Sequence, residues 1–125
     1  MQVLEAIYAG IFPGIPEQIA KARAQVREFL DGCPAADDAV LIISELAANA
    51  ALHSLSRNGI FTVRVKRYGT CVYLEVEDAG GPWIPATPDD RPHGLDIIGK
   101  LARTWGVRES PGRIVWATVN FQEQT

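Results

Sequence analysis

The spacing of apolar residues changes period partway along the chain, and this change limits the folds that the sequence can adopt. From about residue 12 to residue 55, apolar residues recur every three or four positions, as they do on one face of a helix. From residue 59 to 78 they alternate with polar residues, as in a strand with one buried face. Helical spacing then returns at 94–106, and alternation closes the chain. Elements in this order favour an α/β two-layer sandwich of the α+β kind, whose mostly antiparallel sheet carries helices on one face.

Two helices are expected in the first half, after an extended start. The first falls within residues 12–32, because Pro16 suits a first helical turn and Gly32 is a natural stop. The second opens near Asp37 and Asp38, where acidic side chains favour the positive end of the helix dipole. It runs to about residue 55.

The second half predicts two hairpins with a helix between them. Strands 59–67 and 70–78 are joined by a short turn, and a second hairpin over 107–121 turns at Pro111 and Gly112. Trp105, on the helix 94–106, and Trp116, on the last strand, fall on apolar faces and are expected in the core. The apolar face of that helix consists of Leu95, Ile98, Leu101, Ala102 and Trp105.

Composition narrows the class of protein. The 125 residues, of which 47% are hydrophobic, suit one globular domain, residues 1–125, with one core. No apolar run is long enough to span a bilayer and the start lacks the features of a secretory signal, so no membrane association is expected. Cys33 and Cys71 stand alone without metal-ligand spacing, which favours a cytoplasmic location. The net charge is −3 and the basic residues form no cluster, so no direct nucleic-acid binding is expected.

A row of polar side chains crosses the apolar second helix. Glu45, Asn49 and His53 are four residues apart and therefore share one stripe. His53 alone is most simply a histidine satisfied at a helix end. Glu45 and Asn49 instead suggest chemistry, because an amide can ligate hydrated Mg²⁺ beside a phosphate and a carboxylate can accept a proton. A metal site of Glu45, His53 and Asp78 is disfavoured, since no two histidines share a ligand spacing.

Two further candidate segments flank a long aperiodic loop. Asp78 ends a strand and is followed by Gly80, which allows backbone to lie close to a ligand; the alternative is an ordinary strand-to-loop turn. Gly94 opens the next helix, whose free N–H groups either bind an anion or are simply capped. Arg91 and His93 precede it and either add donors for a polyphosphate or are solvated.

Together these segments resemble a known family. Their order is an E-x-x-x-N helix, a hairpin, D-x-G, a long loop, a G-L helix and a late strand with threonine. This order resembles the GHKL ATP-binding fold of gyrase-type, histidine-kinase and mismatch-repair ATPases. The chain is most similar to the small stand-alone branch, the bacterial anti-sigma-factor/serine-kinase ATP-binding proteins abundant in actinobacteria. The resemblance covers nearly the whole chain and includes the motifs "SELAANAALHS", "VEDAGGPW" and "GLDIIGKLARTWGV".

The resemblance implies a site for ATP or ADP with Mg²⁺. In that family pattern Glu45 lies near the γ-phosphate as the catalytic base or water-positioning residue. Asn49 ligates the Mg²⁺ that bridges the phosphates. Asp78 accepts a hydrogen bond from the adenine amino group, and Gly80 leaves room for the ring.

The same resemblance gives roles to later residues. Residues 82–93 would form a lid over the nucleotide. The family's arginine near the γ-phosphate has no exact match here, although Arg91 lies close to its position. The backbone N–H groups of Gly94 and Leu95 would cap the phosphates. Thr118 on the last strand matches the family's threonine near the adenine-binding aspartate.

Two glycines of the family pattern are missing here. In the D-x-G-x-G motif, the last glycine is replaced by Pro82. In the second motif, often G-x-G-L, the first glycine is replaced by Pro92. Because proline removes an N–H group and fixes φ, these changes should stiffen the lid and reduce the donors offered to the phosphates.

Two functions follow from the resemblance. The first is a serine/threonine protein kinase that phosphorylates an anti-anti-sigma (STAS-type) partner and sequesters a sigma factor when that partner is absent. The second is a non-catalytic interaction module, with or without nucleotide, that works by partner switching alone. Glu45 favours the first and the lost glycines favour the second. The family tends to dimerise, so a homodimer is implied on the same ground.

Overall fold

Five strands and three helices make up the described part of the computed structural model, which covers residues 3–54, 58–80, 94–109 and 112–122. The strands pair antiparallel throughout, in the order β1-β2-β3-β5-β4. The elements in chain order are β1 (Leu4–Pro13), α1 (Glu17–Phe29), α2 (Ala36–His53), β2 (Ile60–Tyr68), β3 (Cys71–Asp78), α3 (Gly94–Leu101), β4 (Thr104–Glu109) and β5 (Arg113–Asn120). This is an α+β fold with an antiparallel sheet, as the order of periodicities predicts.

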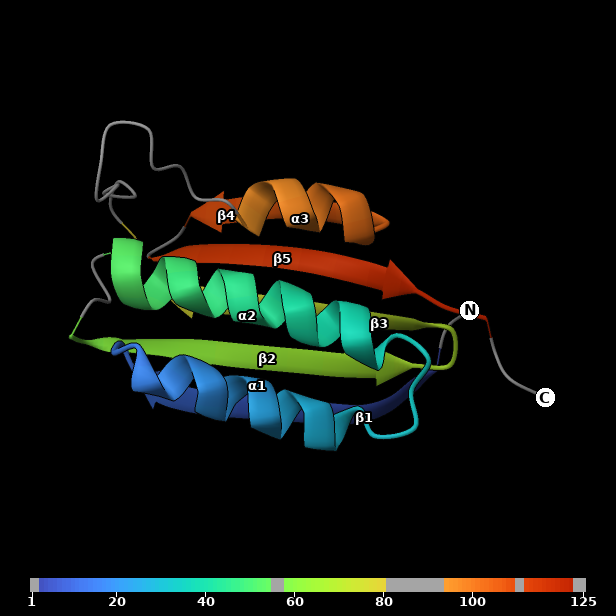
Figure 1. Ribbon diagram of the computed structural model, residues 1–125. Helices are drawn as coiled ribbons and strands as arrows, with labels where there is room; N and C mark the ends of the chain where they lie inside the picture. The colour runs from blue at the N-terminus through green and yellow to red at the C-terminus, as the bar shows by residue number, and fades with distance from the viewer. Residues whose placement is uncertain (1–2, 55–57, 81–93, 110–111, 123–125) are drawn as a thin grey trace.

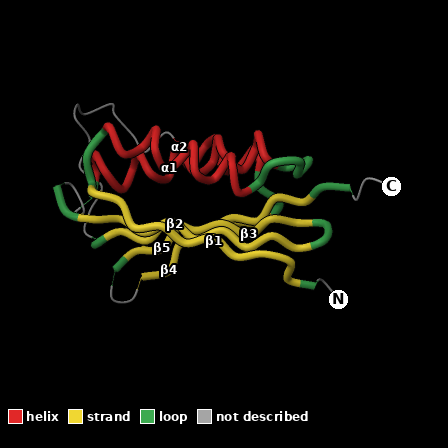
Figure 2. The backbone as a smooth tube through the Cα atoms, turned by 90° about the horizontal axis from the view of Figure 1, so that it is seen from below, coloured by secondary structure: helices red, strands yellow, loops and turns green. Residues whose placement is uncertain are grey.

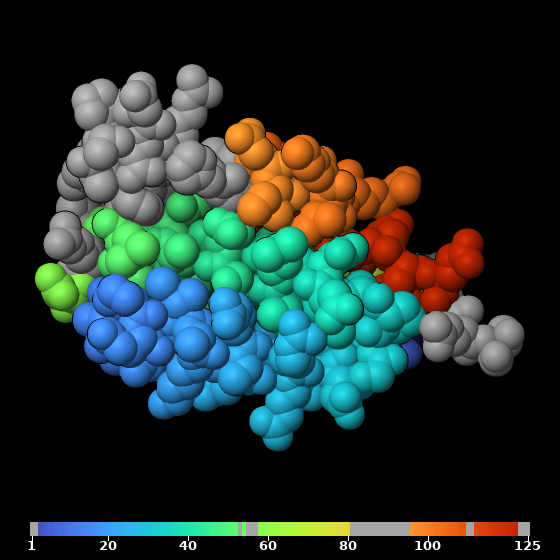
Figure 3. Space-filling model, viewed as in Figure 1, coloured from blue at the N-terminus to red at the C-terminus, as the bar shows by residue number. Residues whose placement is uncertain are grey.

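The helices cover one face of the sheet and leave the other open. Figure 2 shows α1 and α2 on the same side of the strands, and Figure 1 shows α2 lying between α1 and α3. In the space-filling view, α1, α2 and α3 form a continuous layer over that face (Figure 3). Alternation along β2 sends Phe61, Val63 and Val65 inward, where they are almost fully buried. They form the core with apolar residues of α2 such as Ile42 and Leu46.

The first two helices begin and end as their sequence signals predict. α1 starts directly after Pro16, and Gly32 follows its end with a φ of +79°, a conformation that glycine adopts without strain. α2 carries Asp37 and Asp38 in its first turn, at the positive end of its dipole. In the part of the chain that the structure describes, no helix is long and apolar enough to cross a membrane.

The third helix is shorter than its periodicity predicts. α3 ends at Leu101, and the Arg103 N–H then donates to the carbonyl of Thr118 on β5. The residues from Thr104 on pair with β5 as strand β4. Their backbone groups form hydrogen bonds with β5 instead of continuing the helix that the apolar spacing predicts. Trp105 therefore lies on an edge strand and is 39% exposed. The prediction that it belongs to the core is wrong.

Trp116 is also outside the core, on the open face of the sheet. It alternates with the buried Val115 and Ala117, and its ring stacks on Tyr73 with centroids 6.3 Å apart. Gly106 on β4 leaves room for this ring, since a Cβ there would lie 2.9 Å from it. The prediction failed because an apolar residue on a strand can lie on either face, and alternation decides which.

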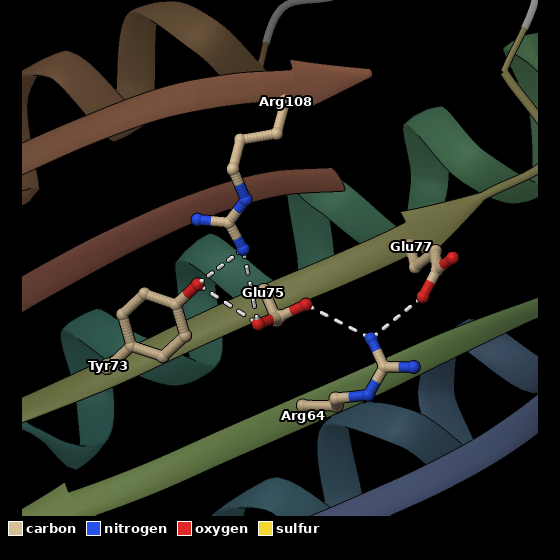
Figure 4. Close-up of polar contacts among 5 residues, drawn as sticks. All are labelled: Arg64, Tyr73, Glu75, Glu77 and Arg108. Atoms are coloured by element: carbon tan, nitrogen blue, oxygen red, sulfur yellow. Dashed lines mark hydrogen bonds and ion pairs between the residues drawn. The ribbon is translucent and has the colours of Figure 1, made fainter. Parts of the chain in front are cut away.

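A network of charged residues ties strands together across the open face (Figure 4). Glu75 on β3 is only 10% exposed in its side chain, and accepts hydrogen bonds from Arg64 and Tyr73, both at 3.0 Å. Arg64, on β2, also reaches Glu77 at 2.8 Å. Arg108, on β4, donates to the Tyr73 hydroxyl at 3.1 Å and lies 3.7 Å from Glu75. Because β5 lies between β3 and β4, this network spans four neighbouring strands.

Candidate functional site

Four elements meet at one end of the sheet. The C-terminal end of α2, the end of β3, the first turn of α3 and the start of β5 all lie on the same side of the molecule, at the left of Figure 1. Antiparallel pairing explains part of this, since β3 and β5 run in opposite directions and Asp78 is paired with Arg113. The C-terminal part of α2, which carries Asn49, and the predicted Asp78 therefore lie at the same end of the sheet, whereas Glu45 lies in the middle of α2.

Asp78 is a buried carboxylate held by the turn that follows it. The residue is 6% exposed and lies two positions after the buried Val76, so both side chains are on the helix-covered side. The Gly80 N–H donates to Asp78 Oδ1 at 2.6 Å, and Gly80 has a φ of +84°. Burial raises the pKa of the Asp78 carboxyl above its usual value, while the Gly80 hydrogen bond and the Arg113 charge oppose the rise. A buried carboxylate with a free oxygen is suited to accept a further donor.

Arg113 and Gly112 belong to this site, although sequence reasoning missed them. Arg113 faces Asp78 in the ladder, is 6% exposed, and lies 3.5 Å from Glu109. A Cβ on Gly112 would clash with the carbonyl oxygen of Asp78, so only glycine fits there. Alternation would have revealed Arg113, because it lies two residues before Val115 and thus on the buried face.

Asn49 presents a buried amide without a partner in the described part of the chain. The residue is 5% exposed, and its Nδ2 makes no hydrogen bond there. At 100° per residue, Asn49 is half a turn around α2 from Val40, which lines the hollow shared with α1. Asn49 is therefore on the flank of α2 away from α1. Figure 1 shows that α3 lies on that side of α2. An unpaired buried amide is costly, and a ligand between α2 and α3 would satisfy it.

Glu45 lies one turn before Asn49 and is half-buried. Its carboxylate forms no ion pair or hydrogen bond with the residues that the structure describes. It is therefore available to a bound group. Within the described ranges, no three His, Cys, Asp or Glu residues gather into a metal site, so a cation here would depend on oxygens from its ligand as well as from Asn49.

The remaining predicted positions are only partly described. Gly94 and Leu95 form the start of α3, at the same end as Asp78, so their backbone N–H groups belong to a helix N-terminus. Arg91, His93 and the proposed lid at 82–93 lie outside the described residues. His53 is the last residue of α2.

Thr118 is not beside Asp78. It pairs with Tyr73 and Thr104, five residues along β5 from Arg113, and its hydroxyl lies 2.6 Å from that of Thr104. Alternation also puts it on the open face with Trp116, whereas Asp78 is on the helix-covered side. The residue across from Asp78 is Arg113.

Comparison with models of known protein families gives no match for this chain, and comparison with curated proteins gives none either.

Proposed function

We propose that this protein binds ATP or ADP with Mg²⁺ between α2, the end of β3 and the start of α3. We further propose that it is a regulator of the anti-sigma-factor kind. In this role it phosphorylates a serine of a STAS-type anti-anti-sigma partner and sequesters a sigma factor when that partner is absent. The resemblance to the GHKL family supplies this interpretation. It is supported by the positions of Asn49, Asp78, Gly80 and Gly94.

The observation that carries the proposal is the buried Asn49 amide. Its Nδ2 has no partner among the described residues, and helical spacing puts the side chain on the flank of α2 away from α1. The Nδ2 would donate a hydrogen bond to a phosphate oxygen of the nucleotide. Mg²⁺ prefers oxygen ligands and usually keeps waters and phosphate oxygens, so the amide Oδ1 of Asn49 is an adequate protein contribution to the metal. When bound, Mg²⁺ would neutralise phosphate charge. The start of α3 adds N–H groups of a kind that bind anions.

Asp78 supports recognition of an adenine. The Gly80 N–H occupies one carboxylate oxygen, which fixes the orientation of the other. A carboxylate in this setting accepts only, so it would select a base with an exocyclic amino group. Gly80 has no side chain and would leave space for the ring.

Nucleotide binding can be tested by titration calorimetry and by thermal shift with MgATP and MgADP. Ligand that binds only the folded state should stabilise it by about 2.7 kcal/mol at 100 times Kd. Asn49→Ala should abolish most of this shift, and Asp78→Asn should weaken it. Ser44→Ala, on the α1 side of α2, is the matched control and should bind as the parent does. Absence of binding at millimolar nucleotide would refute the proposed site.

Asn49→Ala is an informative variant because it should not unfold the protein. It removes an amide nitrogen that has no hydrogen-bond partner in the described region, so no such bond there is broken. We expect its melting temperature without nucleotide to equal or exceed that of the parent. Loss of binding could then be assigned to the site itself.

Phosphoryl transfer depends on Glu45 in this proposal. The protein should be incubated with labelled ATP, Mg²⁺ and the STAS-type proteins of its own genome, followed by analysis for phosphoserine. If Glu45 accepts the proton of the attacking hydroxyl, Glu45→Ala should cut the transfer rate by about 10²–10⁴ while nucleotide binding is retained. A Glu45→Ala protein that transfers phosphate at the parental rate would remove the catalytic role.

The second candidate function is a module that binds nucleotide and partner without chemistry. The specific observation in its favour is the sequence of the lid, in which Pro82 replaces a glycine of the family motif. In that case MgATP binds, STAS-type partners associate, and no phosphoserine forms at any time point. The same assay therefore separates the two functions.

A further inference from the structure

A hollow of about 360 Å³ opens to solvent between α1 and α2, which lie side by side over the sheet (Figure 3). This volume is at the small end of the range of about 300–1,000 Å³ that is usual for small-molecule pockets. Helical spacing puts Asn49 on the opposite flank of α2, so the hollow is separate from the proposed nucleotide site. The described residues that line it are Arg23, Arg27, Asp37, Val40, Leu41 and Ser44.

Arg23 brings to this hollow a positive charge that no carboxylate balances within the part of the chain that the structure describes. Its Nη1 donates to Ser44 Oγ at 3.4 Å, which is near the upper limit for a hydrogen bond. Arg27, on the next turn of α1, is different, because its Nη1 lies 3.0 Å from Asp37 Oδ1. One guanidinium of the lining is therefore paired, and the other has most of its five N–H donors available to a ligand.

Apolar surface lies directly beside the Arg23 guanidinium. Leu41 lies three residues before Ser44 on α2 and is 43% exposed. Residues three apart on a helix are neighbours on its surface, so one ligand can reach both the Leu41 side chain and the Ser44 hydroxyl. The buried Val40 extends the apolar part of the lining. The hollow thus combines an unbalanced positive charge, a hydroxyl group and an apolar patch.

We propose that this hollow binds a small organic carboxylate with a short apolar chain. Arg23 holds the carboxylate through two parallel N–H groups, because the planar fork of a guanidinium matches the two oxygens of a carboxylate. The Ser44 hydroxyl accepts from Arg23 and donates its own hydrogen to the same carboxylate. The chain of the ligand packs on Leu41 and Val40, where burial of its CH₂ groups adds to the affinity.

The charge of the lining favours a monocarboxylate over a phosphate. Asp37 balances Arg27, so Arg23 leaves one net positive charge, which a single negative charge matches. A phosphate group carries nearly two negative charges at neutral pH and would bring them close to the Asp37 carboxylate. It also has no apolar part to cover Leu41. The inference does not rest on the proposed function, because no residue of the nucleotide site takes part in it.

The first test uses sodium hexanoate as the probe, in titration calorimetry at neutral pH. Hexanoate should bind saturably, and more tightly than acetate by roughly tenfold, since its additional CH₂ groups are partly buried. Hexylammonium has a similar chain and the opposite charge, and it should not bind. Inorganic phosphate should bind more weakly than hexanoate. Absence of saturable hexanoate binding, or an equal affinity for any of the other three probes, would overturn the proposal.

The second test assigns the binding to single residues. Arg23→Gln should weaken hexanoate binding by roughly 10–100-fold, because hydrogen bonds to a charged group are lost. Lys21→Gln is the matched control, since it removes the same charge from an exposed position of α1 outside the hollow, and it should bind as the parent does. Leu41→Ala should reduce the preference for hexanoate over acetate. Arg23 and Leu41 are both exposed, so these variants should keep the fold. Parental affinity in Arg23→Gln would overturn the proposal.

The third test separates this hollow from the nucleotide site. Asn49→Ala should bind hexanoate as the parent does, and MgATP should not displace hexanoate from the parent. In an amide NMR titration with hexanoate, the shifts should be largest at the Arg23 side chain and at the backbone N–H groups of Leu41 and Ser44. Shifts centred on Asp78, or loss of hexanoate binding in Asn49→Ala, would refute the α1–α2 hollow as the site. Failure of MgATP to bind would count against the proposed function alone.

Discussion

At the scale of single residues, the most consequential group is the Asp78 carboxylate, because its burial has a cost that a ligand can offset. Its folded pKa is raised, chiefly by desolvation, so the ionised form is disfavoured in the folded protein. The favourable effect of the raised pKa on stability is complete below the unfolded value, about 3.9, and is lost as the pH rises through the folded value. At neutral pH the folded protein therefore holds a carboxylate that burial destabilises.

We predict that Asp78→Asn raises the melting temperature at pH 7 by roughly 2–5 °C. The amide removes the charge and keeps an oxygen to accept from the Gly80 N–H. The gain should shrink as the pH is lowered toward 4, where the parental carboxyl becomes neutral. Thermal melts of both proteins at several pH values measure this difference. Asp31→Asn, at an exposed carboxylate, should show no comparable gain, and an Asp78→Asn protein less stable than the parent at pH 7 would contradict the prediction.

Gly112 gives a second prediction at this scale. Gly112→Ala should lower the free energy of unfolding by about 1–3 kcal/mol, because its Cβ would collide with the Asp78 carbonyl and force β3 and β5 apart. Chemical denaturation measures this loss. Gly99→Ala on α3 is a suitable control, since a Cβ there meets only the Trp105 ring, at an ordinary 3.9 Å. Equal stability of the two variants would show that the backbone can relax at Gly112.

At the scale of elements, the open face of the sheet depends on Glu75. Glu75→Ala should cost about 1–3 kcal/mol, because Tyr73 and Arg108 both lose the carboxylate that they share. Glu77→Ala is the matched control on the same strand. It should cost much less, because Arg64 keeps its bond to Glu75 and the Glu77 side chain is 30% exposed. Urea unfolding of both variants compares them, and an equal loss would mean that Arg64 alone holds the network.

Most elements could be predicted from the sequence, because their signals are local. Helical spacing with Pro16 and Gly32 predicts α1 correctly, and alternation predicts β2 and β3. The end of α3 could not be found this way. The stretch from Ala102 to Trp105 continues a helical pattern, and only the ladder with β5, a partner distant in sequence, makes it a strand.

For the candidate site too, features set by local signals could be predicted from the sequence, and features set by strand pairing could not. Asn49, Glu45 and Asp78 lie on elements that periodicity predicts, so the face of the element on which each lies could be expected. Cross-strand neighbours require the register, which no local signal supplies. The family resemblance implies that Thr118 lies near Asp78, whereas the register places Arg113 opposite Asp78.

At the scale of the whole molecule, one helix layer on one sheet face concentrates stability in residues of α2 that face the sheet. Ile42→Ala should lower the free energy of unfolding by about 2–5 kcal/mol, since the side chain is fully buried and a cavity would remain. Leu41→Ala, one residue earlier and 43% exposed, should change it by less than about 0.5 kcal/mol. Guanidinium unfolding measures both. A large loss for Leu41→Ala would show that its exposed face is covered in solution.

The strand order has a consequence for how the chain assembles. β5 lies between β3 and β4 although it follows both in sequence, so β4 has no strand to pair with until β5 has been added. In the portion from β1 to β3, the α1–α2 pair and the β2–β3 hairpin join elements that are close in sequence and can form early, because short loops close at little entropic cost. β1 pairs with β2 across both helices. The surroundings of Asp78 are different, since Gly112 and Arg113 arrive with the last strand. During synthesis the half of the protein that carries Asn49 is therefore expected to fold first, and the surroundings of Asp78 are completed last.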